Sequence, residues 1–149
     1  MRKVFLFVIL ISPFLYFSSC SFGRCMRIVN YTMDTVCIYS AKIDNINSVE
    51  YSIGFGEIFI LELDNTGKII INDESLILPD SAGRYCEGES KRNFFRYNKD
   101  NKGYFFIIKL ETVRNYTWEE IKKNKLYDKL IVTREMLEKN DWKINYYGK

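Results

Sequence analysis

The sequence predicts a mainly β domain of the α+β class: an antiparallel β-sandwich or open barrel with two short helices near the C-terminus. Short segments rich in Val, Ile, Phe and Tyr recur along the chain. Turn signals separate them at intervals of roughly eight to twelve residues, as in sandwiches and barrels. Helix-capping patterns appear in the last third. Residues 26–149 are long enough for a single domain with a sizeable core.

Six strands are predicted in the first half of this domain. The unbroken apolar run Ile58–Leu61 indicates a strand that is covered on both faces. The residues Asp64–Lys68 form a strong turn signal, because Gly67 can take the positive φ that such a turn requires. Pro79 ends the sixth strand, since proline has no amide hydrogen to donate. The predicted strands are 26–30, 35–40, 49–53, 57–63, 68–72 and 76–78.

The middle of the chain contains a long loop followed by the most apolar segment. Residues 81–92 form the longest weakly structured stretch, which makes them the expected place for a binding loop. Residues 94–97 and 104–110 are predicted strands, and the hairpin turn between them contains Gly103. The second strand is predicted to be the central one, because a near-continuous apolar run suits burial on both faces.

The first predicted helix begins at a capping box. Thr117 and Glu120 have the required spacing, in which the hydroxyl and the carboxylate each accept a hydrogen bond from a free backbone amide. The helix is expected to continue to about Lys125. Glu119 and Lys123 are expected to pair on its outer side, since residues four apart are neighbours on a helix surface.

The last part of the chain predicts a strand, a helix and a further strand. Residues 128–133 form the strand, and Thr133 is a suitable N-cap for a short helix over 134–139. In residues 142–146 the apolar side chains alternate with Lys and Asn. This pattern predicts a final strand at the edge of a sheet, with its polar face in solvent.

The first nineteen residues have the layout of a secretory signal peptide. Arg2 and Lys3 are followed by the apolar run Val4–Phe17, and then by two serines and Cys20. A cysteine in this position resembles the lipobox of bacterial lipoproteins, in which that cysteine receives a diacylglyceryl group and becomes the first residue. The expected organisation is a signal peptide at 1–19, a lipid-attached tether at 20–25 and one β-rich domain at 26–149.

Two other interpretations of this segment compete with the lipobox. A transmembrane anchor needs about 20 apolar residues, whereas Val4–Phe17 is shorter and contains Pro13. An ordinary signal peptidase could cut after the small residues Ser18 and Ser19. Phe17 stands where most lipoboxes have leucine. No acidic run follows Cys20, which favours the periplasmic side of the outer membrane over the cell surface.

Charge is distributed unevenly along the chain. Residues 20–90 contain 5 basic and 11 acidic side chains, and residues 91–149 contain 15 basic and 8 acidic ones. The two parts can neutralise each other within one fold, or a basic face can bind anionic lipid or a polyanionic glycan. Without residues 1–19 the net charge is close to zero, which argues against a nucleic-acid partner.

The residue types also restrict the chemistry. The chain has no histidine, which excludes Ser-His-Asp and Cys-His catalysis and histidine-ligated metal sites. We expect no cofactor and no metal. If Cys20 carries lipid, Cys37 and Cys86 are the candidate disulfide and Cys25 remains on the tether. Three unpaired thiols are the alternative, because connectivity cannot be deduced from sequence.

Three segments resemble a family of known location. Residues 31–39, 116–121 and 130–146 are similar to small lipoproteins of Bacteroides and its relatives. That family has an early Asn-x-x-x-Asp-Thr hairpin, a Trp-x-x-Ile helix and a Trp-x-Ile-x-Tyr ending, after which it has proline where this chain has Tyr147. The resemblance implies an envelope location and carries no activity. Thr35 and Ser81, each after an aspartate, are similar to O-glycosylation acceptors of these bacteria, although such short patterns also occur in ordinary turns.

Three functions are consistent with these patterns. The first is a non-catalytic envelope lipoprotein, bound to the membrane through its N-terminal lipid, whose β domain binds an envelope protein or glycan. The second is an accessory subunit of an outer-membrane uptake or fimbrial assembly. The third is a small hydrolase that uses two carboxylates, from Glu87 and Glu89 or from Glu119 and Glu120. Capping and solvation explain these glutamates better, so we expect no catalytic residue.

Overall fold

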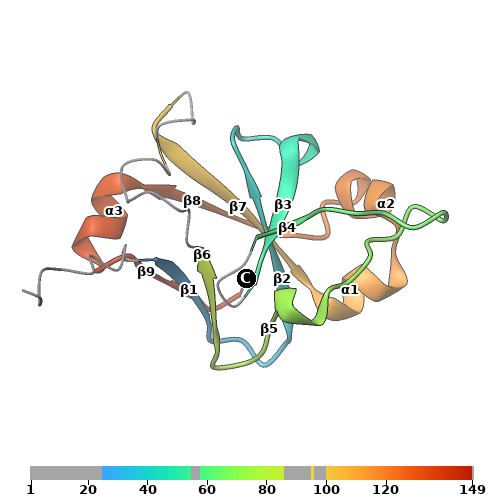
Figure 1. The fold of residues 1–149 in the computed structure, drawn as a ribbon, viewed down its shortest axis with the longest axis horizontal. Coiled ribbons are helices and arrows are strands. Elements are labelled where there is room, and N and C mark those ends of the chain that lie inside the picture. Colours follow the sequence, from blue (N-terminus) through green and yellow to red (C-terminus); the bar gives the residue numbers. More distant parts are fainter. Residues whose placement is uncertain (1–24, 55–57, 86–94, 96–99, 149) are drawn as a thin grey trace, which may run out of the picture.

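Two β-sheets and three short helices form the described part of the chain, residues 25–54, 58–85, 95 and 100–148 of a computed structural model (Figure 1). The strands are β1 (Met26–Asn30), β2 (Val36–Ala41), β3 (Val49–Ile53), β4 (Ile58–Ile60), β5 (Leu76–Ile77), β6 (Ala82–Tyr85), β7 (Lys102–Lys109), β8 (Asp128–Thr133) and β9 (Lys143–Tyr146). The helices are α1 (Leu110–Asn115), α2 (Trp118–Lys123) and α3 (Arg134–Lys139). This composition confirms the predicted fold class, mainly β with a sandwich-like arrangement.

The larger sheet has the strand order β4-β3-β2-β7-β8, and its strands are antiparallel. β5 joins it by pairing with the first two residues of β2. The smaller sheet has the order β6-β1-β9, in which β9 is an edge strand as predicted. β1 and β9 are parallel, which departs from the predicted antiparallel pattern. A parallel neighbour cannot be reached by a hairpin, and the chain enters β9 from α3.

The inner core lies between the two sheets. Met26 and Ile28 of the smaller sheet point inward. They belong to one buried cluster with Phe105 and Ile107 of β7 in the larger sheet, and each of the four is at most 2% exposed. The hydroxyl of Tyr146 in β9 also donates a hydrogen bond to Asp128 of β8 at 2.6 Å, which ties the two sheets together. Burial of these apolar surfaces is the main contribution to the stability of the sandwich.

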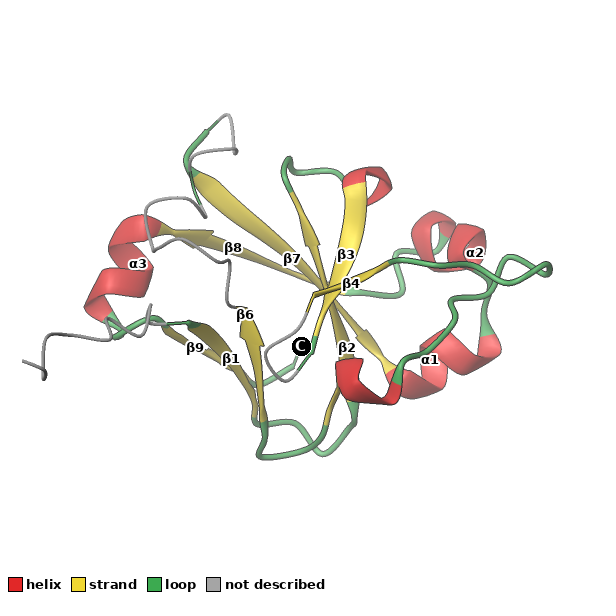
Figure 2. Cartoon of the chain, in the orientation of Figure 1, coloured by secondary structure: helices red, strands yellow, loops and turns green. Residues whose placement is uncertain are grey.

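An outer core covers the other face of the larger sheet. Tyr104, Phe106 and Ile108 alternate with the inner-core residues along β7 and belong to one buried cluster with residues of α1 and α2. Figure 2 shows these two helices on the side of the larger sheet away from β1 and β9. Trp118 and Ile121 are the buried side chains of α2, as its amphipathic pattern predicts. β7 is therefore buried on both faces, which confirms that the most apolar segment forms a strand in the interior of the sheet.

The two predicted helices begin where their caps predict. Thr117 and Glu120 form the complete capping box of α2, and the Thr133 side chain accepts a hydrogen bond from the Met136 amide at the start of α3. The expected pair of Glu119 with the lysine four residues later is wrong, because Glu119 pairs with Lys122, three residues later. Either spacing brings two side chains together on a helix surface.

Three elements differ from the prediction. Ile60 is 70% exposed, because β4 lies at the end of the larger sheet, so this segment is not covered on both faces. Residues 68–72 do not form the predicted strand. The chain reverses at Gly67, whose φ is +80°, and Ile69 makes one isolated bridge to Leu63 across this turn. Residues 110–115 form the unpredicted helix α1. The predicted strand 94–97 lies outside the described residues except for Phe95, which is in a turn.

Candidate functional site

The turn between β1 and β2 is organised by one buried asparagine. The Asn30 side-chain amide donates hydrogen bonds to the carbonyls of Asp34, at 2.7 Å, and Ile77, at 3.1 Å. Its carbonyl oxygen accepts from the amide and the hydroxyl of Thr32, at 3.0 and 2.7 Å. Asn30 is 0% exposed, so these bonds satisfy a polar side chain that water cannot reach. They hold the residues after β1 in one conformation.

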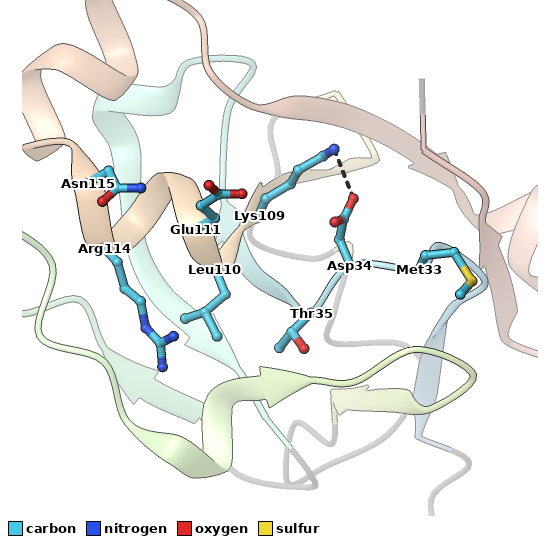
Figure 3. Close-up of a pocket in the computed structure, with 8 residues that line it drawn as sticks. All are labelled: Met33, Asp34, Thr35, Lys109, Leu110, Glu111, Arg114 and Asn115. Atoms are coloured by element: carbon cyan, nitrogen blue, oxygen red, sulfur yellow. Dashed lines mark ion pairs between the residues drawn. The ribbon is translucent and has the colours of Figure 1, made fainter.

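This turn forms one wall of an open pocket of about 300 Å³ (Figure 3). The opposite wall comes from the end of β7 and from α1. Figure 3 shows the Asp34 and Lys109 side chains meeting on one side of the pocket, while Arg114 extends on the other. The lining residues are Met33, Asp34, Thr35, Lys109, Leu110, Glu111, Arg114 and Asn115.

The polar groups of the pocket carry charges of both signs. Lys109 and Asp34 form an ion pair of 2.8 Å, and the hydrogen bond and charge of Asp34 raise the pKa of Lys109. Arg114 is exposed, and its planar guanidinium can bind a carboxylate or phosphate in a bidentate manner. Met33 is 92% exposed at the rim. The arrangement suits an exposed polar segment of a partner or a small charged ligand.

Apart from Thr35, sequence reasoning missed the residues that line this pocket. Lys109 and Arg114 had no assigned role, because their distance from Asp34 along the sequence hides their proximity. Asn30 has a local signal that could have revealed it: the order Asn, Thr, Asp at alternate positions after a strand is typical of side chains that bond their own turn.

The structure brings the two predicted O-glycosylation acceptors to the same end of β1. Thr35 lies in the pocket wall, half-buried, and its carbonyl accepts a hydrogen bond from the Leu110 amide at 2.9 Å. Ser81 is also half-buried, and its carbonyl accepts a hydrogen bond from the backbone amide of Asn30 at 2.9 Å. The Ser81 hydroxyl donates to the Leu78 carbonyl at 2.7 Å. Modification at either residue stays a prediction.

The carboxylates considered for hydrolysis are not brought together among the described residues. Glu120 accepts hydrogen bonds from the Thr117 amide and hydroxyl, each at 2.8 Å, which lower the pKa of its carboxyl. Glu119 forms an exposed ion pair with Lys122. The capping interpretation is therefore confirmed for Glu120. Glu87 and Glu89 lie outside the described residues.

The predicted disulfide is wrong at Cys37, which is a free, buried thiol. Its side chain lies in the outer core of the larger sheet and is 1% exposed. Cys25 is disulfide-bonded and immediately precedes β1 in the smaller sheet, so it is not an unpaired thiol on the tether. Cys20 and Cys86 lie outside the described residues.

Burial raises the pKa of the Cys37 thiol to about 11. We therefore expect iodoacetamide to leave Cys37 unmodified in the folded protein and to alkylate it in denaturant, because the thiolate is the reactive form. In the same digest the peptide with Cys25 should remain cross-linked until a reductant is added. Peptide mass spectrometry measures both. Rapid alkylation of Cys37 in the folded protein would contradict its burial.

Two kinds of feature are absent from the described residues. No helix there is long and apolar enough to span a membrane. No group of three or more Cys, Asp or Glu side chains within that part of the chain could hold a metal ion.

Comparisons with known proteins do not assign the chain to a family. No protein-family model, no curated protein and no solved structure matches it. The lipoprotein resemblance of residues 31–39, 116–121 and 130–146 therefore stays an expectation. The features that bear on function are the N-terminal segment and the geometry of the domain.

Proposed function

We propose that this chain is an envelope lipoprotein, lipidated at Cys20 and held on the periplasmic side of the outer membrane, whose β domain binds a partner without catalysing a reaction. The observation that carries the proposal is the N-terminal order of basic residues, apolar run and Ser18-Ser19-Cys20. The same order accounts for export and for the means of attachment, and the lack of an acidic run after Cys20 favours the periplasmic side.

The arrangement of the domain supports this function. β1 begins six residues after Cys20, so a tether of at most about 20 Å would join the lipid to the domain. The pocket formed by Asp34, Lys109 and Arg114 lies beyond the other end of β1, which is about 17 Å long. A domain held by its tether can therefore present this pocket away from the membrane.

Two of the described carboxylates are already engaged in an ion pair or a helix cap, which favours binding over catalysis. Asp34 is paired with Lys109, and Glu120 is engaged in the capping box. A carboxylate pair for hydrolysis instead needs one member with a raised pKa. The hydrogen bonds to Glu120 lower its pKa, which is opposite to the shift that a general acid requires.

Lipidation is tested by metabolic labelling of host cells with an alkyne analogue of palmitate. We expect the chain to be labelled and recovered in the membrane fraction, and Cys20→Ser to lose both properties. Ser21→Ala is the matched control, because it changes the next residue and leaves the acceptor thiol intact. A label that persists in Cys20→Ser, or is absent from the unaltered chain, would remove lipid attachment at this residue.

A further inference from the structure

Three basic side chains lie next to one another across the smaller sheet. Arg27 of β1 pairs with Arg84 of β6 on one side and with Lys143 of β9 on the other. Residues that pair across strands project from the same face of a sheet. Met26 and Ile28 are buried in the inner core, so Arg27 projects from the outer face. We call Arg27, Arg84 and Lys143 the basic row.

The basic row has no acidic partner among the described residues. The ion pairs of that part of the chain all involve other lysines. Lys143 instead contacts Tyr31: its ammonium donates to the phenol oxygen at 3.2 Å and lies 5.6 Å from the ring centroid. Arg27 and Arg84 are exposed. Like charges on neighbouring strands repel, and an anionic surface across the row would relieve that repulsion.

The row lies at the end of the domain where the tether begins. Arg27 is two residues after Cys25 and seven after Cys20, a separation of at most about 25 Å. The Arg27 amide also donates to the Trp142 carbonyl at 2.8 Å, directly after α3, so this is the α3 end of the molecule. Figure 1 shows α1 and α2 at the opposite end. A lipid on Cys20 would therefore hold the row close to the membrane surface.

We propose that the basic row binds the phosphate headgroups of anionic phospholipids in the leaflet that holds the Cys20 lipid. This proposal rests on the proposed function, because lipidation is what places the row at a leaflet. Guanidinium groups bind phosphate oxygens in a bidentate manner, and basic side chains beside an anionic leaflet are attracted to its surface potential. The row spans three adjacent strands, with Arg27 and Arg84 exposed and Lys143 partly exposed, which suits a surface of many headgroups.

Such contacts orient the domain. The α3 end would lie on the membrane, and α1, α2 and the pocket with Asp34 and Lys109 would point towards the periplasm. The whole chain has a net charge of only +3, and residues 1–19 contribute Arg2 and Lys3. The attraction therefore comes from the local arrangement of the row and not from a basic protein as a whole.

The proposal is tested with residues 20–149 carrying Cys20→Ser, a chain that contains every strand and helix of the described residues. Its co-sedimentation with vesicles of phosphatidylglycerol and phosphatidylethanolamine is compared with that of vesicles of phosphatidylcholine. The row variant is R27Q/R84Q/K143Q. The matched control, K42Q/K123Q/K125Q, removes the same charge from exposed positions just after β2, in α2 and just after α2, all outside the pocket with Asp34 and Lys109. Circular dichroism and thermal melts establish that each variant is folded.

We expect binding to the anionic vesicles only, and weaker binding at high salt, because salt screens surface charges. The row variant should bind roughly a hundredfold more weakly, since each basic side chain at an anionic surface strengthens binding roughly fivefold. The control should bind like the unaltered domain. These four results together would support the proposal.

Three results would overturn it. The first is no preference of the unaltered domain for anionic vesicles. The second is an equal loss in the row variant and the control, which would indicate net charge alone. The third is binding to heparin, a polyanionic glycan, without binding to vesicles. Because the probe has no lipid, its result is independent of lipidation: an unlipidated Cys20 in the host would remove the proposed function even if the row bound vesicles.

Discussion

Replacement of Asn30 by alanine is expected to lower the free energy of unfolding by roughly 3 kcal/mol or more. The substitution removes four side-chain hydrogen bonds at a site that is 0% exposed. The carbonyl of Ile77 would lose its side-chain donor, and the backbone amide of Thr32 would lose its acceptor. A buried polar group without a partner costs more than the net value of the bond it formed.

Urea denaturation of the variant measures this loss. Asn145→Ala is the matched control, because Asn145 is exposed on β9 and its replacement is expected to change stability by less than about 0.5 kcal/mol. The Asn30 variant should also disturb the pocket, since the turn with Asp34 forms its wall. Equal stability of the two variants would show that the Asn30 bonds do not anchor this turn.

Replacement of Phe105 by alanine is expected to lower the free energy of unfolding by roughly 3–5 kcal/mol. Phe105 is 0% exposed in the inner core, on the strand that both cores share. Loss of the ring removes apolar contacts and leaves a cavity that the rigid sheets on either side cannot fill completely. In a domain of this size such a loss is a large part of the total stability.

The control for this substitution is Ile131→Ala on the neighbouring strand β8. Ile131 is 40% exposed, so its truncation removes less buried surface and leaves no closed cavity. Thermal unfolding followed by circular dichroism should show a much larger decrease in Tm for the Phe105 variant. A decrease of the same size in both variants would contradict the assignment of Phe105 to the core between the sheets.

The local features of the fold could be predicted from sequence because their signals are local. The capping box at Thr117 and Glu120 and the N-cap at Thr133 define helix starts within a few residues. The apolar segment around Phe105 is long enough to indicate a strand buried on both faces. The expectation for Ile58–Leu61 was wrong because an apolar run does not reveal whether a strand lies inside a sheet or at its edge.

The features that depend on how distant segments pair and pack could not be predicted. The basic row joins Arg27 and Arg84, from the part of the sequence with net negative charge, to Lys143 from the basic part, so the charge distribution gives no sign of it. The parallel pairing of β1 with β9 decides which residues meet. Similarly, the sequence does not show whether Cys37 forms a disulfide. Its position in the outer core, as a free and buried thiol, decides this.

Intact-protein and N-terminal peptide mass spectrometry, on the chain purified from membranes of its native host, tests the central claim most directly. The account predicts a mature chain that begins at Cys20 and carries the added mass of a lipid on that residue. A chain that begins at another residue near position 20 without added lipid mass would contradict it and would indicate a secreted domain without an anchor. In that case the partner should be sought in solution.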